Sequence, residues 1–448
     1  MKEIAVINFS CLPRADATVP LGPLYILSAL EANLVPNEFF DTQLASNPQN
    51  LSGPLNDIIA HADIIALSCL SSVSLPSLLI MTQEIRDRYP TKLIVIGGQG
   101  SSGAAQKIIT EFTTIDGIVI GDGMLGLIDL SRGASIGNIR AHVVYKEGKN
   151  VCIRRNRHGE IPLDKIPVPA YHHIDYAMYR RTGIILSSGC TRKCGFCVTR
   201  PIWGTARYRN IQSIATELLH LRSTYACKNF DVFDEALFLN DWLRHEFCQL
   251  LLDLSIDLRW RCYGTIAPLE IASMKNMAKA GCHTVFFTVG SGSDEILAKL
   301  NCAYTSKDAV ELLVAATNYF ESVYCYVLFG YPYEDINAFY DTLLFATLLA
   351  EKGVNTTFKL ASPFGMAPFY NDSDETPFHF VPQFVEQMLE GFSEKQLPHN
   401  AIDMIKAYPT IFPEFHTVDI DNIQRKLAML TRRDEVKLSS YHWQAISF

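Results

Sequence analysis

The stretch SGCTRKCGFC, residues 188–197, carries cysteines at positions 190, 194 and 197 and follows a strand-like run at residues 183–186. Cysteine thiolates are the usual ligands of iron–sulfur clusters, and three ligands so close in sequence can wrap one cubane cluster while leaving its fourth iron free. A structural zinc site needs four closed ligands, and no second cysteine pair lies at a suitable distance. The stretch therefore predicts a 4Fe–4S cluster held by Cys190, Cys194 and Cys197.

Strand-like runs alternate with helical patterns throughout residues 181–370. The six runs are residues 183–186, 229–233, 258–262, 284–288, 323–328 and 356–360. Consecutive strand–helix units of this kind are typical of an open, partial version of the eight-fold βα barrel. The fold expected for residues 181–370 is therefore a partial (β/α)6 barrel, with the cysteines in the loop after its first strand.

Residues 1–140 show the same alternation, with strand-like runs at residues 4–9, 64–68, 93–96 and 117–120. Strands alternating with helices imply a parallel, doubly wound, Rossmann-like sheet. Such sheets bind ligands at the carboxyl ends of their strands, where Ser- and Gly-rich loops fall in this sequence. Two further regions are expected, namely a proline-containing linker at residues 141–180 and a mostly helical C-terminal region at residues 371–448.

The composition is that of a globular protein, since 48% of the 448 residues are hydrophobic and 19% are charged. A net charge of −8 without a basic stripe disfavours nucleic acid as a partner. Serines and Pro76 interrupt the most apolar region, residues 64–81, so no membrane span is expected. The sequence starts without a signal segment, so a cytoplasmic location with reduced cysteines is expected.

The spacing Cys-x-x-x-Cys-x-aromatic-Cys after a first barrel strand resembles the signature of the radical S-adenosylmethionine (SAM) enzymes. The resemblance implies that the open iron chelates the amino and carboxylate groups of SAM. It further implies that an electron from the cluster, delivered by a donor such as flavodoxin or ferredoxin, yields a 5′-deoxyadenosyl radical. By the same resemblance, Phe196 is expected close to the adenine of SAM.

Further segments resemble this family in the same order along the barrel. The sequence FDEALF resembles its Asp-Asp-x-x-Phe segment, which implies that Asp234 and Glu235 lie near the SAM amino group. The sequence FFTVGSGS resembles its Gly-x-Glu-Ser-Gly-Ser block and implies a SAM contact at Ser291. Gly290 stands where the family has a SAM-contacting Glu, so SAM is expected to be held differently there. Two later segments, residues 329–335 and 362–368, resemble the family's Gly-x-Pro-x-Glu turn and closing Pro-x-x-Gly-Thr-Pro.

The N-terminal segments are similar in order to the cobalamin-binding domain that precedes many radical SAM barrels. Their loops let the backbone approach a planar corrinoid and bond to its amide side chains, and a large side chain at Gly98 is expected to clash with the corrin. The Asp-x-His-x-x-Gly motif is missing, and His61 and His142 lie outside the loops, so no histidine is expected on cobalt. The resemblance implies cobalamin contacts at Leu21, Gly22, Ser68, Ser71, Ser72, Gly97, Gly98, Gln99, Gly121, Asp122 and Gly123.

Together the resemblances imply a cobalamin-dependent radical SAM methyltransferase, which transfers a methyl group from SAM via methylcobalamin to a carbon of a small metabolite or peptide. Radical SAM enzymes that use cobalamin for rearrangement or cyclisation are one alternative. Radical SAM methylthiotransferases, which hold a second cluster on three N-terminal cysteines, are another. Cys11 and Cys69 stand at strand ends as that requires, but the third strand ends in Gln99. A non-catalytic cobalamin or redox sensor is the last alternative, and it would have no use for a full SAM site.

Overall fold

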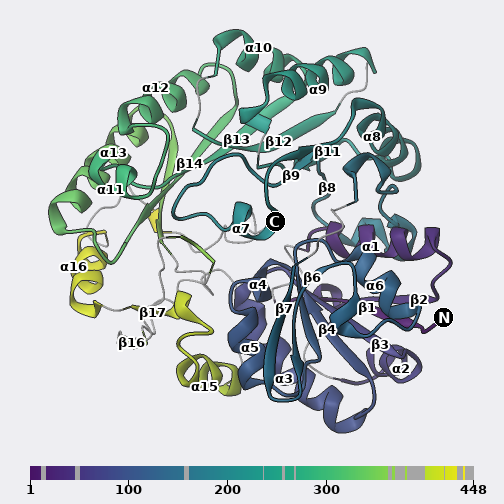
Figure 1. The fold of residues 1–448 in the computed structure, drawn as a ribbon. Coiled ribbons are helices and arrows are strands. Elements are labelled where there is room, and N and C mark those ends of the chain that lie inside the picture. Colours follow the sequence, from purple (N-terminus) through teal and green to yellow (C-terminus); the bar gives the residue numbers. More distant parts are fainter. Residues whose placement is uncertain are drawn as a thin grey trace. The chain divides into compact units, whose positions relative to one another are not determined.

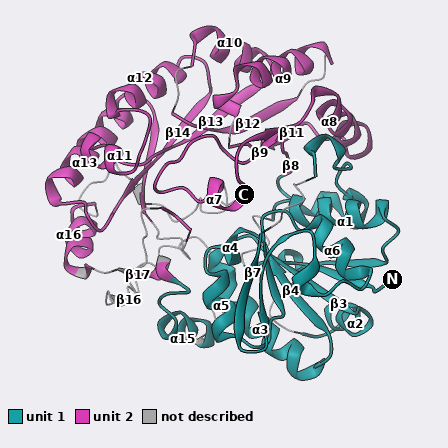
Figure 2. Cartoon of the chain, viewed as in Figure 1, with its two compact units in different colours: residues 1–181, 388–412, 441–448 teal, residues 182–387, 413–440 magenta. Residues whose placement is uncertain are grey.

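The chain forms two compact units (Figure 1; Figure 2). The first comprises residues 1–181, 388–412 and 441–448, and the second comprises residues 182–387 and 413–440. The C-terminal part of the chain therefore contributes to both. The computed structural model describes the whole chain except residues 12–16, 46–50, 156–160, 236, 255–257, 267–268, 362–365, 369–378, 381–398, 418, 431–436 and 439–448.

The first unit is built on a seven-stranded sheet with the order β2-β1-β3-β4-β5-β6-β7. The first five strands run parallel, whereas β6 and β7 continue the sheet antiparallel. The order 2-1-3-4-5 is that of a doubly wound fold whose winding reverses between β1 and β3, and ligands bind such folds at the carboxyl ends of the strands there. The strands are β1 (Ile4–Phe9), β2 (Asn37–Asp41), β3 (Ile64–Cys69), β4 (Leu93–Gly97), β5 (Gly117–Ile120), β6 (His142–Glu147) and β7 (Asn150–Arg154).

Helices pack on this sheet and bury its central strands. All six residues of β1 are buried, as expected of a parallel strand covered on both faces. Helix α1 packs against α6, and α15, from the C-terminal part of the chain, packs against α3. The helices of this unit are α1 (Leu21–Ala32), α2 (Pro54–His61), α3 (Leu75–Arg88), α4 (Gln99–Ser102), α5 (Ala105–Glu111), α6 (Met124–Ser131) and α15 (His399–Ala407).

The second unit contains a seven-stranded parallel sheet with the order β18-β15-β14-β13-β12-β11-β8. Its strands are β8 (Gly183–Ile184), β11 (Asn229–Val232), β12 (Arg259–Gly264), β13 (Cys282–Val289), β14 (Ser322–Phe329), β15 (Asn355–Leu360) and β18 (Lys437–Leu438). The first six correspond to the six runs expected from the sequence, and the two-residue β18 extends the edge. The expected partial barrel is thereby confirmed.

Helices α8, α9, α10, α12 and α13 line the convex side of this curved sheet, and α7 lies on its concave side (Figure 1). On the convex side Phe247 of α9 meets Trp260 of β12 with ring centroids 5.3 Å apart, and Phe339 of α13 meets Phe329 of β14 at 5.4 Å. The helices are α7 (Thr199–Trp203), α8 (Ile211–Tyr225), α9 (Asp241–Asp253), α10 (Ile271–Lys279), α11 (Asp294–Lys299), α12 (Ser306–Ala316), α13 (Ile336–Glu351) and α16 (Ile420–Leu430).

The structure divides the chain differently from the expected domains in one region. Residues 141–180, expected as a linker, contain β6 and β7 of the first sheet, and the first unit continues to Arg181. The C-terminal region is largely helical where it is described, but α15 belongs to the first unit and α16 to the second. Two short antiparallel ladders also form, β9 (Ser187–Ser188) with β10 (Arg207–Tyr208) and β16 (His379–Phe380) with β17 (His416–Thr417).

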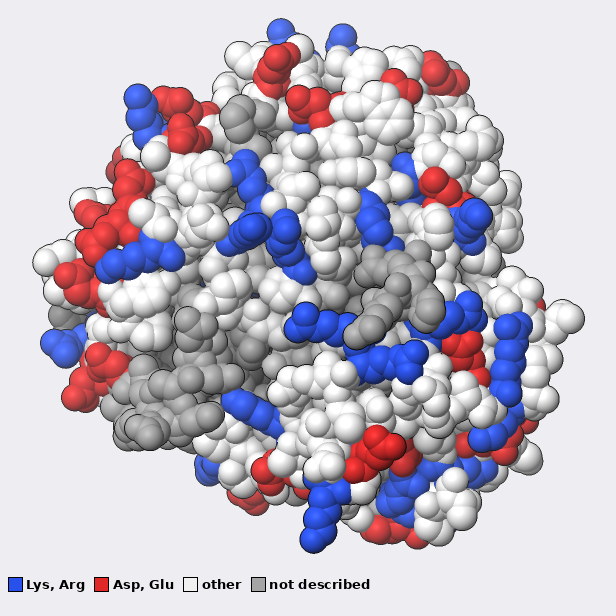
Figure 3. Space-filling view, in the orientation of Figure 1, with Lys and Arg blue, Asp and Glu red and all other residues white. Residues whose placement is uncertain are grey.

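None of the helices in the described part of the chain has the length and apolarity needed to cross a membrane. On the face drawn in Figure 3, basic and acidic side chains both occur among uncharged ones.

Candidate functional site

The cysteine loop runs from β9 to α7, and glycine is required at its start. Gly189 has φ +81°, and a Cβ there would meet the carbonyl oxygens of Gly204 and Thr205 at 2.8 Å. The next residue, Cys190, donates its backbone N–H to the carbonyl oxygen of Gly204 at 3.2 Å. The loop therefore passes so close to the turn after α7 that only a residue without a side chain fits there.

The three cysteines of the loop have free thiols that affect one another's ionisation. Burial raises the pKa of Cys197 to about 11, and charge repulsion from Cys194 and Cys190 adds to the rise. Among the described residues, these thiols do not form a group with all three sulfur atoms within 4.8 Å of one another, as ligands of a single ion would. A cubane cluster accepts the wider spacing because each thiolate binds a different iron, and the iron cations stabilise thiolates that otherwise repel. The three cysteines therefore fit the expected cluster.

The turn after α11 braces the cysteine loop. The backbone N–H of Gly195 donates to the carbonyl oxygen of Leu300 at 2.6 Å. Asn301, in a left-handed conformation with φ +52°, donates its side-chain amide to a backbone carbonyl of the loop at 3.2 Å. The thiol of Cys302 is hydrogen-bonded to Cys194. A fourth cysteine thus contacts the cysteine loop, and no sequence pattern indicates this contact because the two segments are distant along the chain.

Gly290 has a packing reason to depart from the family's glutamate. A Cβ at this position would meet two ring carbons of Phe196 at 2.9 and 3.1 Å. The backbone of Gly290 is held on both sides, since its N–H donates to the hydroxyl of Tyr304 at 3.0 Å and its carbonyl accepts from the hydroxyl of Tyr331 at 2.8 Å. The missing side chain therefore lets the Phe196 ring lie against the end of β13, and a glutamate would require that ring to move.

Two acidic residues follow β11 where the SAM amino group is expected. Asp234 is 1% exposed and accepts a hydrogen bond from the hydroxyl of Ser187 at 2.9 Å. Burial, together with the neighbouring Asp234, raises the pKa of Glu235 to about 8. A nearby cation would stabilise both carboxylates in their charged form, so the pair fits an ammonium group.

Ser291, expected beside them at the SAM site, is engaged within the protein. The residue is fully buried, and its hydroxyl lies 3.0 Å from the hydroxyl of Thr342 on α13. The same hydroxyl accepts a hydrogen bond from the backbone N–H of Ser293 at 3.1 Å. The side chain of Ser291 therefore joins the end of β13 to α13.

An aromatic wall lines the concave face of the second sheet, which the sequence did not reveal. Phe286 on β13 stacks on Tyr263 of β12 and on Tyr324 of β14, with centroid distances of 5.2 and 4.9 Å. Arg261 lies over the same ring at 5.7 Å and is paired with Asp231 at 2.6 Å. Alternation along β14 was a usable signal, because every second residue of a strand points to the same face.

Lys359 on β15 extends this wall. Its neighbour in sequence, Phe358, packs against Phe339 of α13 on the convex side, so Lys359 points to the concave face. The side chain is 2% exposed, and its Nζ lies 4.4 Å from the ring centroid of Tyr326. Burial lowers the pKa of Lys359 well below its usual range. Groups whose pKa is strongly shifted by burial occur often at functional sites.

The residues expected to contact cobalamin gather at the carboxyl edge of the first sheet. Ser71 and Ser72 follow β3, Gly98 and Gln99 follow β4, and residues 121–123 follow β5. Leu21 and Gly22 begin α1, which comes after β1. Within the described residues, Oε1 of Gln99 is buried without a hydrogen-bond donor. Buried acceptors are rarely left without a donor, so this atom fits a ligand rich in amide N–H groups, as a corrinoid is.

The packing of the first unit by itself requires glycine at position 98, in addition to the expected approach of the corrin. The residue has φ +93°, and a Cβ there would lie 2.3 Å from the carbonyl oxygen of Cys69 at the end of β3. Any side chain at position 98 therefore disturbs the packing of the β4 loop on β3, whether or not a ligand is bound. A loss of binding on substitution of Gly98 would not by itself report a clash with the corrin.

The two histidines expected outside the ligand loops differ in position. His61 is exposed in the last turn of α2, with its Nδ1 2.7 Å from the carbonyl oxygen of Asp57. His142 is the first residue of β6 and pairs with Ile120, the last residue of β5. Burial lowers the pKa of His142, which favours its neutral form. The structure thus brings His142 to the same sheet edge as the ligand loops, which the sequence did not indicate.

Cys11 and Cys69 lie at this edge as buried, engaged thiols. The sulfur of Cys69 donates to the carbonyl oxygen of Ser71 at 3.2 Å, and the sulfur of Cys11 lies 3.4 Å from the hydroxyl of Ser74. The neighbouring strand β4 is followed by Gly98 and not by a cysteine. This arrangement does not favour a second cluster on three N-terminal cysteines.

Residues 184–346 match the model of the Radical SAM superfamily. These residues are a radical SAM domain. The matched range contains the cysteine loop and β11 to β14, so the resemblance drawn from the cysteine spacing is confirmed.

Several proteins resemble the chain beyond the radical SAM domain. An uncharacterized methyltransferase of Pyrococcus horikoshii is 25% identical over 266 residues, which cover 57% of this chain and 58% of that protein. The radical SAM methyltransferase TsrM from Kitasatospora setae, solved with cobalamin and a [4Fe–4S] cluster bound, has a TM-score of 0.67 at 16% identity, covering 87% of this chain and 78% of TsrM. The cobalamin-dependent SAM radical enzyme OxsB, solved with aqua-cobalamin and SAM, has a TM-score of 0.65 at 14% identity, covering 98% of this chain and 62% of OxsB.

These similarities establish the fold of the chain but not its activity. At identities of 14–16% the two solved structures share the fold of both units of this chain. The chain spans 58% of the length of the Pyrococcus relative, less than two thirds of it. The radical SAM domain and the preceding doubly wound domain are therefore the common features on which a function can be built.

Proposed function

We propose that the chain is a cobalamin-dependent radical SAM methyltransferase that transfers a methyl group from SAM to a carbon of a small metabolite or peptide. The observation that carries the proposal is the pairing of a three-cysteine loop in a radical SAM domain with a doubly wound sheet of the order 2-1-3-4-5. Relatives and neighbours named as methyltransferases support it. When bound, a reduced cluster, SAM and cobalamin supply a radical source and a methyl carrier.

Different residues of the chain bind the cluster, SAM and cobalamin. Cys190, Cys194 and Cys197 hold the cluster through three thiolates, and the turn after α11 keeps their loop in place. The carboxylates of Asp234 and Glu235 bind the ammonium group of SAM, because a cation offsets their mutual repulsion. In the first unit, Gln99 accepts a hydrogen bond from a corrinoid amide, and the backbone of the adjacent glycine loops approaches the ring closely.

The concave face of the second sheet is the proposed substrate side. The stacked rings of Phe286, Tyr263 and Tyr324 form a row of aromatic side chains that packs against an apolar part of a substrate. Lys359 lies beside Tyr326. A substrate carboxylate or phosphate next to Lys359 would favour its protonated form, which then carries a positive charge. The wall thereby orients the substrate, and its burial excludes water from a reactive centre.

The test is an anaerobic incubation of the chain, loaded with iron, sulfide and hydroxocobalamin, with a strong reductant and SAM that carries a deuterated methyl group. The expected result is S-adenosylhomocysteine together with a deuterated methyl group on the extracted corrinoid. The control is the variant with Cys190, Cys194 and Cys197 all changed to Ala, which should bind no cluster. Near-full iron loading of that variant would show that the cluster ligands lie elsewhere.

Two outcomes would reject the methyltransferase proposal. If the loaded, reduced chain makes only 5′-deoxyadenosine and never labels the corrinoid, a rearrangement or cyclisation reaction takes its place. If the chain retains no hydroxocobalamin at all, the assignment of the first unit fails.

A natural electron donor such as flavodoxin or ferredoxin should replace the chemical reductant in the same assay.

A further inference from the structure

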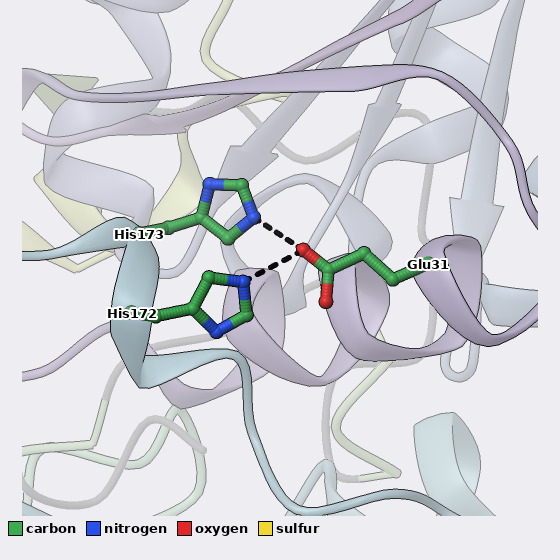
Figure 4. Close-up of side chains that lie close together, drawn as sticks. All are labelled: Glu31, His172 and His173. Carbon is green, nitrogen blue, oxygen red and sulfur yellow. Dashed lines mark hydrogen bonds and ion pairs between the residues drawn. The ribbon is translucent and has the colours of Figure 1, made fainter.

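Three side chains that could bind a metal ion converge within the first unit (Figure 4). Nε2 of His172 lies 2.9 Å from Oε1 of Glu31, and Nε2 of His173 lies 2.5 Å from the same oxygen. All three candidate ligand atoms lie within 4.8 Å of one another. Both imidazole rings therefore direct the same type of nitrogen at one carboxylate, although the histidines are adjacent in sequence.

The backbone that carries the histidines is fixed along α1. The hydroxyl of Ser28 donates to the carbonyl oxygen of Val168 at 2.5 Å, and the backbone N–H of Ala170 donates to the carbonyl oxygen of Leu24 at 3.1 Å. Glu31 is the next residue along the same face of the helix, because positions 24, 28 and 31 follow helical spacing. The converging atoms are thus supplied by a rigid helix and by a segment docked on it at two other points.

The segment is also anchored from within. Tyr171, directly before the two histidines, is fully buried, and a short 3-10 helix, Tyr171–His173, sets the direction of both imidazoles. The ring of His173 contacts Phe39 edge-on at 6.5 Å, and the two imidazole rings lie 4.6 Å apart. The ligand geometry is therefore preorganised, which lowers the entropy cost of binding an ion.

The hydrogen bonds among these three side chains contribute little to the stability of the folded chain. The side chains of His172, Glu31 and His173 are 65%, 35% and 22% exposed, so water competes for every one of these contacts. Polar pairs that water can reach contribute little to stability. An ion held by all three atoms at once gains the energy of three bonds to groups that are already in position, and the exposure leaves room for water in the remaining coordination positions.

The donor set selects the class of ion. Two neutral imidazole nitrogens and one carboxylate oxygen suit zinc and its neighbours among the divalent first-row metals. Calcium and magnesium prefer oxygen ligands alone, and copper(I) prefers sulfur. We propose that Glu31, His172 and His173 form a binding site for one zinc-class divalent ion, which fastens residues 168–173 to α1. This site is independent of the cluster, of SAM and of the proposed methyl transfer.

The experiment measures zinc on the full-length chain after its cluster has been reconstituted, so that the cluster cysteines are occupied. The protein is equilibrated anaerobically with buffered Zn²⁺, passed through a desalting column and analysed for zinc per chain. The double variant H172A/H173A is compared with wild type and with H61A. His61 is an exposed histidine of the same unit whose ring contacts its own helix, so it controls for nonspecific binding by surface imidazoles.

Wild type and H61A should retain zinc equally, and the double variant should retain about one zinc fewer per chain. Loss of a supporting partner of a metal ligand already weakens binding about 10–100-fold, so removing ligands should cost at least that much in the apparent Kd. The variant E31Q, which keeps a hydrogen-bond acceptor but loses the charge, should also bind zinc at least tenfold more weakly, and it covers the case in which the double variant does not fold. Equal zinc retention by wild type, the double variant and E31Q would overturn the proposal.

Discussion

Removal of the ammonium group of Lys426 should destabilise the second unit far more than loss of a surface charge. Lys426, on α16, is fully buried and forms an ion pair of 2.8 Å with Glu334, which is also fully buried. Its Nζ additionally donates to the backbone carbonyl oxygen of Glu334 at 2.8 Å. The backbone N–H of Gly330 donates to the same carboxylate at 2.6 Å. These contacts attach the C-terminal helix to the loop that follows β14.

The substitution Lys426→Met keeps an unbranched side chain of similar length and removes the charge. It leaves the carboxylate of Glu334 buried with Gly330 as its remaining donor, while Oε1 already has no hydrogen-bond partner among the described residues. Breaking a buried pair by removing one partner costs about 3–5 kcal/mol. The double variant E334Q/K426M should recover a large part of this loss, because replacing both charges of a buried pair is often close to neutral.

The loss of stability in K426M should depend on pH, and the direction of this dependence follows from the pKa of Glu334. Burial raises the pKa of Glu334, and Lys426 opposes that rise. Without Lys426 the folded-state pKa moves further above the unfolded value. The stability contribution of such a group is present below the unfolded pKa and lost as the pH rises through the folded pKa. The deficit of K426M should therefore be largest at neutral and alkaline pH and shrink toward about pH 5.

The assay is hydrogen exchange of α16 and β14, read as local free energies of opening, because a chain of two units need not unfold in a single step. The matched control is Lys299→Met, which breaks a surface pair with Glu295 whose side chains are 44% and 70% exposed. That control should change the local free energy by less than about 1 kcal/mol. A K426M effect no larger than that of K299M, or one that grows toward acid pH, would refute the reasoning.

Three further predictions follow from the site. G98A should lower the thermal stability of the cobalamin-free chain, because its Cβ would lie 2.3 Å from the carbonyl oxygen of Cys69, and an unchanged melting temperature would contradict that contact. Oxidation of the cluster-free chain with diamide should link Cys194 to Cys302, which peptide mapping detects, whereas C302S should give no such link. E235Q should stabilise the ligand-free chain at about pH 9 but not at about pH 5.5, since the pKa of Glu235 is raised to about 8 and its stabilising protonated form is lost above that value. Equal melting-temperature shifts at the two pH values would exclude this role of Glu235.

The sequence alone determined those features whose physical cause is local. Three cysteines within eight residues predict a cluster-binding loop without reference to the rest of the chain. The buried strands of both sheets are short apolar runs between helical patterns, so six of the seven strands in the second unit's sheet were predicted, and only the two-residue edge strand β18 was not. Strand β2 was not predicted from the sequence, because Asn37–Asp41 is an edge strand that is only partly buried and has no continuous apolar run. Strands β6 and β7 were not predicted either, because nearby prolines and a mixed composition favoured a linker in this region.

Tertiary structure alone decided which distant side chains meet. The contact of Cys302 with Cys194, the ion pair of Lys426 with Glu334 and the convergence of His172 and His173 on Glu31 join segments that are remote along the chain. Cys194 and Glu334 lie in motifs of the sequence, but nothing in the sequence marks their partners Cys302 and Lys426, or groups Glu31 with His172 and His173. Periodicity reports which face of an element is buried, but not which other element covers that face. Pairings of this kind arise only when packed elements bring their side chains within bonding distance, and for that reason they had to be read from the folded chain.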